Sequence, residues 1–91
     1  MYGFTDAVRK LENETGFSAV EIAAVRDLME IDQEVIDVIL RDMARTGEVV
    51  LALGDWSCSD EHTRSGAITY KATAENYQAY DRHMLLVSIK K

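Results

Sequence analysis

The sequence predicts a small α+β domain in which three helices precede a two-stranded hairpin and a fourth helix. Apolar residues recur at helical spacing in three segments before Gly47, and two β-prone runs then flank a polar segment that is bounded by Gly54 and Gly66. The chain has 91 residues, of which 47% are hydrophobic, and this is enough for one core and too little for two. We therefore expect residues 1–91 to form a single domain.

The first helix is predicted over residues 5–15. Phe4, Val8 and Leu11 recur at helical spacing, and Gly16 suits the left-handed conformation that commonly closes a helix.

The second helix has the clearest local start signal. Ser18 and Glu21 have the spacing of a capping box, and Phe17 with Ile22 forms the matching hydrophobic staple. We therefore expect a helix that begins after Ser18. Its small residues Ala23 and Ala24 would let another helix approach closely.

The third helix is predicted to begin after Asp32, with Ile31 and Ile36 as its staple. The link from the second helix is then only about three residues long, which indicates a tight helix-turn-helix. The usual turn carries a glycine or another small residue, whereas this chain has Glu30.

A hairpin is predicted over about residues 48–72, because the runs 48–53 and 67–71 are both β-prone. The connection between them, residues 54–66, is longer than most hairpin loops, which indicates a mobile tip or a contact surface. A fourth helix is expected over about residues 73–89, with Thr73 as its cap and Tyr77, Tyr80 and Met84 at helical spacing. Residues 84–89 fit either a continued helix or a terminal strand, and we favour the helix.

Two segments carry a resemblance to a known family. They are the series Ile36, Leu40, Met43, Gly47, Val49 and the stretch 70–76. Residues 17–76, about two thirds of the chain, resemble winged helix-turn-helix domains of small bacterial and archaeal regulators. The resemblance implies that the third helix reads bases in the major groove and that the hairpin is a wing that touches the DNA backbone or minor groove. The same fold also serves as a protein-binding module in larger complexes.

The candidate site consists mainly of the residues that face outward when the apolar side of the third helix is buried. When the apolar series is turned inward at about 100° per residue, Glu34, Val38, Arg41 and Arg45 face outward and Asp37 lies on the flank. Among the helix residues, only Gln33, Arg41 and Arg45 are ordinary base readers. The wing adds Trp56, which either packs back on the protein or anchors a partner, and Arg64. The predicted nucleic-acid or partner-binding residues are Gln33, Glu34, Asp37, Val38, Arg41, Arg45, Trp56 and Arg64.

The charge of the chain opposes DNA binding. The net charge is −6, and the third helix carries the acids Asp32, Glu34, Asp37 and Asp42. The first two acids also suit the positive end of the helix dipole, and the other two have the spacing to pair with the arginines at positions 41 and 45. A phosphate-binding strip would require four arginines to lie side by side in the fold, namely Arg26, Arg41, Arg45 and Arg64.

Two hypotheses remain open. The first is a DNA-binding transcriptional regulator, a homodimer that pairs through the first helix and residues 77–89. The second is an acidic winged-helix module that binds another protein and not DNA.

Catalytic and metal-binding motifs are sparse. Cys58 and His62, with Asp60 and Glu61 between them, are potential metal ligands, but a structural zinc site needs a second pair of ligands. No phosphate-binding loop, dinucleotide motif or catalytic carboxylate pair is present. We therefore expect no enzyme activity, no cofactor and no metal. One cysteine, no secretory signal and no long apolar run together predict a cytoplasmic protein without a membrane span.

Overall fold

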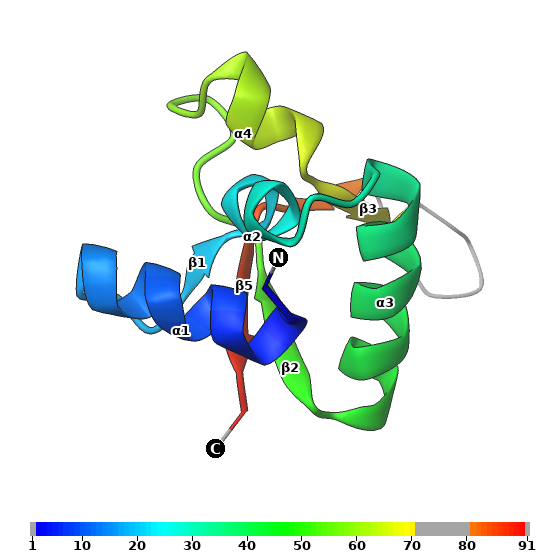
Figure 1. Ribbon diagram of the computed structural model, residues 1–91. Coiled ribbons are helices and arrows are strands. Elements are labelled where there is room, and N and C mark those ends of the chain that lie inside the picture. Colours follow the sequence, from blue (N-terminus) through cyan, green and yellow to red (C-terminus); the bar gives the residue numbers. More distant parts are fainter. Residues whose placement is uncertain (1, 71–80, 91) are drawn as a thin grey trace.

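The computed structural model describes residues 2–70 and 81–90 and shows a small α+β domain (Figure 1), as the sequence predicts. Its helices are α1 (Phe4–Thr15), α2 (Ile22–Met29), α3 (Gln33–Thr46) and α4 (Glu61–Ser65). Its strands are β1 (Val20–Glu21), β2 (Val49–Ala52), β3 (Ile68–Tyr70), β4 (Arg82–Met84) and β5 (Leu86–Ile89). No helix of these two ranges is long and apolar enough to cross a membrane.

The first and third helices form where the sequence places them. α1 ends at Gly16, which has a φ of 77° and whose N–H bonds back to Glu12. α3 begins after Asp32, although the Asp32 side chain accepts no capping hydrogen bond. In the short turn before α3, Glu30 takes up the left-handed conformation with a φ of 54°. The predicted helix-turn-helix is therefore present, and a glutamate occupies the position that glycine usually fills.

The predicted start of the second helix is wrong. α2 begins at Ile22, and Glu21 at its N-cap makes no side-chain capping bond. Val20 and Glu21 instead form β1, which pairs with residues of β5, and the N–H of Ile22 bonds to Leu85. Pairing with a strand far along the chain satisfies these backbone groups, so it overrides the local capping signal.

The predicted hairpin of residues 48–72 is also wrong in its pairing. β2 and β3 lie in the two predicted runs, but β2 pairs antiparallel with β5, from Val49 opposite Ile89 to Ala52 opposite Leu86. The main sheet has the order β1-β5-β2, and β3 pairs with β4 in a second, two-stranded sheet. The intervening α4 contacts α2 and carries the chain away from β2 before β3 begins.

The predicted C-terminal helix of residues 73–89 is wrong over residues 82–89, where β4 and β5 follow one another with only Leu85 between them. Its first part, residues 71–80, lies outside the described residues. Val87 is buried in the central strand of the main sheet, opposite both Val20 and Leu51. The two flanking strands bury this segment, which fits a strand better than a surface helix.

One hydrophobic core joins the helices to both sheets. Ile22, Ile36 and Leu40 from the helices are fully buried in the same cluster as Val87 of β5 and Ile68 of β3. The core face predicted for the third helix is therefore confirmed, with Met43 packed against the cluster at its edge. This packing fixes which side of α3 faces away from the protein.

Candidate interaction surface

The outward face of α3 is apolar and acidic. Val38 is 67% exposed and Val35, one helical turn earlier, is 45% exposed, with Glu34 exposed beside them. The sequence analysis placed Val38 and Glu34 on this face, and the structure agrees. It did not include Val35, although the three-residue spacing from Val38 is a sufficient signal that the two share a face.

Gln33 does not point away from the protein as a base reader would. Its Oε1 accepts a hydrogen bond from Nη1 of Arg26 at 3.0 Å, and its Nε2 is buried without a partner among the described residues. Gln33 is the first residue of α3, so its side chain lies against the end of α2 that carries Arg26. The prediction that Gln33 contacts a partner is therefore not supported by its placement.

Arg41 is held by the protein itself. Its Nε donates to the carboxylate of Asp37, and its Nη2 donates to the backbone oxygen of Thr69 at 2.6 Å. The guanidinium also lies 5.1 Å from the centre of the Tyr70 ring. Arg41 thus connects α3 to β3, a contact that depends on the long-range position of β3. The predicted pairing of Asp37 with Arg41 is confirmed.

Arg45 keeps an exposed side chain. It is 77% exposed and forms the predicted ion pair with Asp42, three residues earlier. An exposed pair of this kind is easily exchanged for water or for another partner. Arg45 is therefore the more exposed of the two predicted arginine readers on α3, since the Arg41 side chain is 40% exposed.

The other two arginines are also bonded to the protein. Arg26 donates to Gln33 and to the hydroxyl of Ser65, and it pairs with Asp27. Arg64 donates from Nε and Nη2 to the backbone oxygen of Trp56, at 2.9 and 2.7 Å. Each of the four arginines that would form a phosphate-binding strip is thus engaged with protein oxygens.

Trp56 packs back on the protein, which is one of its two predicted roles. Its ring stacks on His83 of β4 with the ring centres 4.5 Å apart, and the Arg64 guanidinium lies 5.1 Å from its centre. The ring remains 39% exposed. His83, which the sequence analysis placed on a helix, is therefore part of this cluster on β4.

The loop before α4 and the first turn of α4 contain the remaining candidate ligands. The carboxylate of Asp60 caps α4 by accepting from the N–H of Thr63 at 2.8 Å, and this bond lowers the pKa of Asp60. The carboxylate of Asp55 accepts a hydrogen bond from the Cys58 thiol, which raises the pKa of Cys58. His62 lies 2.6 Å from the carboxylate of Asp27 on α2. Within residues 2–70 and 81–90, no three His, Cys, Asp or Glu side chains gather as metal ligands do.

Protein-family models, curated proteins and solved structures were compared with the chain. None of the three gives a significant match.

The outward face of α3 combines exposed apolar and acidic side chains. Val35 and Val38 offer apolar area, and the exposed Glu34 supplies negative charge beside it, while the charge of Asp42 is paired with Arg45. Aligned apolar and acidic groups fit a partner that carries apolar side chains among lysines or arginines.

Proposed function

We propose that this chain is a winged-helix domain that binds another protein through the outward face of α3. The fold part of the proposal is supported by the order of the elements. A short strand lies between the first two helices, and it forms a three-stranded antiparallel sheet with two strands that follow the third helix. Under this proposal the wing consists of β2 and β5, and α4, β3 and β4 belong to an extended wing tip.

The observation that carries the protein-binding proposal is the state of the polar side chains on α3. Gln33 and Arg41 are bonded to other parts of the protein, while Val38 is the most exposed apolar residue of the helix. Binding of DNA depends on lysines and arginines that neutralise phosphates. An exposed valine beside acids instead suits a basic and partly apolar protein surface.

DNA binding by a transcriptional regulator is the second candidate. It is favoured by one observation, the exposed Arg45 near the end of the helix that would enter the major groove. A regulator of this kind is expected to be a homodimer, because operators commonly match a two-fold axis. For either candidate we propose a cytoplasmic location, since the one cysteine leaves no disulfide to form within the chain.

The substitution Val38→Arg separates the two candidates, because it has opposite effects on them. On a protein-binding face it replaces apolar contact with a charge, and we expect at least a tenfold loss of the partner. In a DNA groove it adds a cation, and duplex affinity should stay equal or increase. The matched control is Thr5→Arg, which changes an exposed β-branched residue on α1.

Two measurements are needed. Proteins of the source organism are recovered on immobilised wild-type chain and on both variants, and are quantified by mass spectrometry. A fluorescent DNA duplex is titrated with the same three proteins at low salt and followed by polarisation. A protein that is lost with Val38→Arg and kept with Thr5→Arg supports the proposal. If Val38→Arg retains every recovered protein, or if the wild-type chain binds the duplex below the micromolar range, the proposal is wrong.

A further inference from the structure

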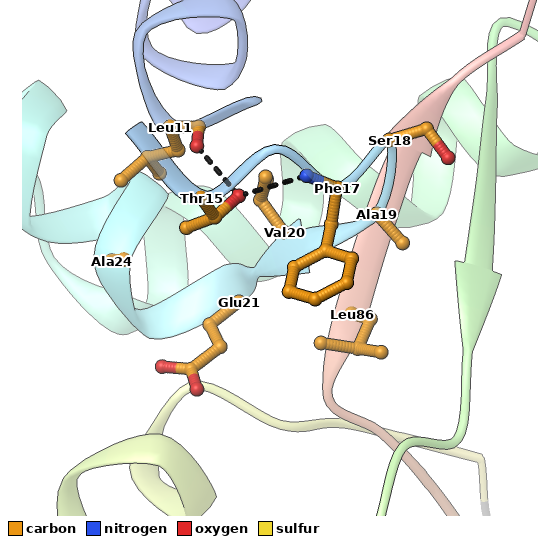
Figure 2. A pocket seen from close by; sticks show the side chains of 9 residues that line it. All are labelled: Leu11, Thr15, Phe17, Ser18, Ala19, Val20, Glu21, Ala24 and Leu86. Carbon is orange, nitrogen blue, oxygen red and sulfur yellow. Dashed lines mark hydrogen bonds between the residues drawn. The ribbon is translucent and has the colours of Figure 1, made fainter. Parts of the chain in front are cut away.

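An apolar groove lies away from α3, between the second half of α1, the segment 16–19, the start of α2 and β5 (Figure 2). Its volume is about 540 Å³, which is within the range of roughly 300–1,000 Å³ that is typical of ligand sites. Leu11, Val20, Ala24 and Leu86 form its apolar lining. None of its lining residues belongs to α3 or to the cluster formed by Trp56, Arg64 and His83.

Phe17 is held at the edge of this groove. Gly16, in the left-handed conformation, ends α1 and turns the chain, and the N–H of Phe17 then donates to Oγ1 of Thr15 at 3.2 Å. The Thr15 hydroxyl in turn donates to the backbone oxygen of Leu11 at 2.8 Å. The polar groups of this edge are therefore satisfied within the protein, and the Phe17 ring is presented to solvent. It is 70% exposed, more than any other large apolar side chain of the described residues.

A large exposed aromatic ring beside an apolar groove is typical of a binding surface. Scattered single apolar residues are common on protein surfaces and need no explanation, but Phe17 adjoins a continuous apolar lining. A bulky side chain from another molecule would remove both the ring and the lining from water.

The rim of the groove is negative. The Glu21 carboxylate lines one end, where it accepts a hydrogen bond from the hydroxyl of Thr63. α1 ends at Thr15, which also lines the groove, and the last turn of α1 contains no basic residue that would neutralise the negative end of the helix dipole. The Glu14 carboxylate is paired with Lys10 at 2.6 Å. Among the described residues, no cation pairs with Glu21.

We infer that this groove binds a segment of a partner protein in which a bulky apolar side chain lies next to lysine or arginine. The apolar side chain fills the groove beside Phe17, and the cation lies against Glu21 and the end of α1. A second copy of this chain fits less well, because a two-fold interface would bring the same acidic rim together with itself. This site goes beyond the proposed function, since it uses no residue of α3.

The inference is tested by NMR titration of the full chain, labelled with ¹⁵N and with ¹³C in its alanine and leucine methyl groups. The probe is the blocked pentapeptide Gly-Lys-Phe-Lys-Gly, compared with Gly-Glu-Phe-Glu-Gly and Gly-Lys-Ala-Lys-Gly. With the first peptide we expect saturable shifts at the methyl groups of Ala19, Ala24 and Leu86. The glutamate peptide should bind about fivefold more weakly, as surface charge pairs allow. The alanine peptide should give no saturable shift.

Variants of the chain locate the site. Glu21→Gln keeps an acceptor for Thr63 but removes the charge, so we expect severalfold weaker binding of the lysine peptide. The matched control Glu34→Gln removes a carboxylate from α3 and should leave this binding unchanged. Ala19→Trp should fill the groove and abolish the shifts. If Ala19→Trp is unfolded, two comparisons still test the inference: Glu21→Gln against its control Glu34→Gln, and the lysine peptide against the glutamate peptide.

Three outcomes would overturn the inference. The first is the absence of saturable shifts at the groove, and the second is equal binding of the lysine and glutamate peptides. The third is a concentration dependence of the same methyl shifts without any peptide, which would identify a second copy as the occupant. Val38→Arg should bind the lysine peptide like the wild-type chain, so failure of the α3 proposal is distinguishable from failure of this one.

Discussion

At the scale of single residues, the environment of Cys58 makes its thiol a weak nucleophile. The side-chain hydrogen bond to Asp55, and then the charge of that carboxylate, raise the pKa of Cys58. A thiolate beside a carboxylate is disfavoured, so the thiol stays protonated to higher pH than a free cysteine does.

We therefore expect Asp55→Asn to lower the midpoint of the pH profile for alkylation of Cys58 by iodoacetamide, and to increase the rate at pH 8. The neutral reagent avoids any attraction to the acidic surface. Asp60→Asn is the control, because the Asp60 carboxylate bonds to the N–H of Thr63 and not to Cys58. An unchanged midpoint in Asp55→Asn would contradict this account.

Glu30 is the second residue of interest at this scale, because its backbone conformation is unfavourable for a residue with a side chain. It is the one described non-glycine residue with a positive φ, and it follows α2 at the position that glycine usually fills. We expect Glu30→Gly to raise the free energy of unfolding by about 1 kcal/mol, because glycine avoids the clash of Cβ in this conformation. Urea denaturation measures the change. Glu34→Gly, within α3, should lower the same quantity by about 1 kcal/mol, and a similar loss in Glu30→Gly would show that the turn is unstrained.

At the scale of elements, α4 is positioned by a close approach to α2. A Cβ on Gly66 would lie 2.5 Å from the backbone nitrogen of Ala23. The sequence analysis expected Ala23 to permit such an approach by a helix, and the chain that ends α4 makes it. This contact places α4 and the loop that carries Trp56.

Gly66→Ala is therefore expected to lower the free energy of unfolding by about 1–3 kcal/mol, because backbone atoms of α2 would have to move. Its matched control is Gly3→Ala, since a Cβ on Gly3 meets no atom within 4 Å. Urea denaturation of the two variants checks the difference. Equal stability of both would mean that α4 shifts without cost.

At the scale of the whole molecule, the first and third helices were predictable because their signals are local, whereas the start of α2 was predicted wrongly and α4 falls in a segment expected to be a loop. The spacing of Ile36 and Leu40 fixed the buried side of α3 and therefore the exposure of Val38. The strands were located in part, but their pairing was not. Residues 86–89 form a strand because they pair with β1 and β2, which lie far away in the sequence.

In the candidate site too, local contacts were predictable from the sequence and long-range contacts were not. Helical geometry predicted the ion pairs of α3, which join residues three and four positions apart. It did not predict the bond of Arg41 to Thr69 or that of Gln33 to Arg26, because each joins two elements whose relative position depends on the complete fold. Two of the three side chains on α3 that were expected to read DNA bases, Gln33 and Arg41, therefore make contacts that the sequence did not predict.

The central position of β5 also has a consequence for the way in which the chain folds. β1 and β2 each pair with β5 and not with each other. During synthesis, all the described helices leave the ribosome before β5, so β1 and β2 cannot pair in the main sheet until β5 has been made. Pairing across such sequence separations is slow compared with the formation of helices. We expect closure of the sheet around β5, and not formation of the helices, to set the folding rate.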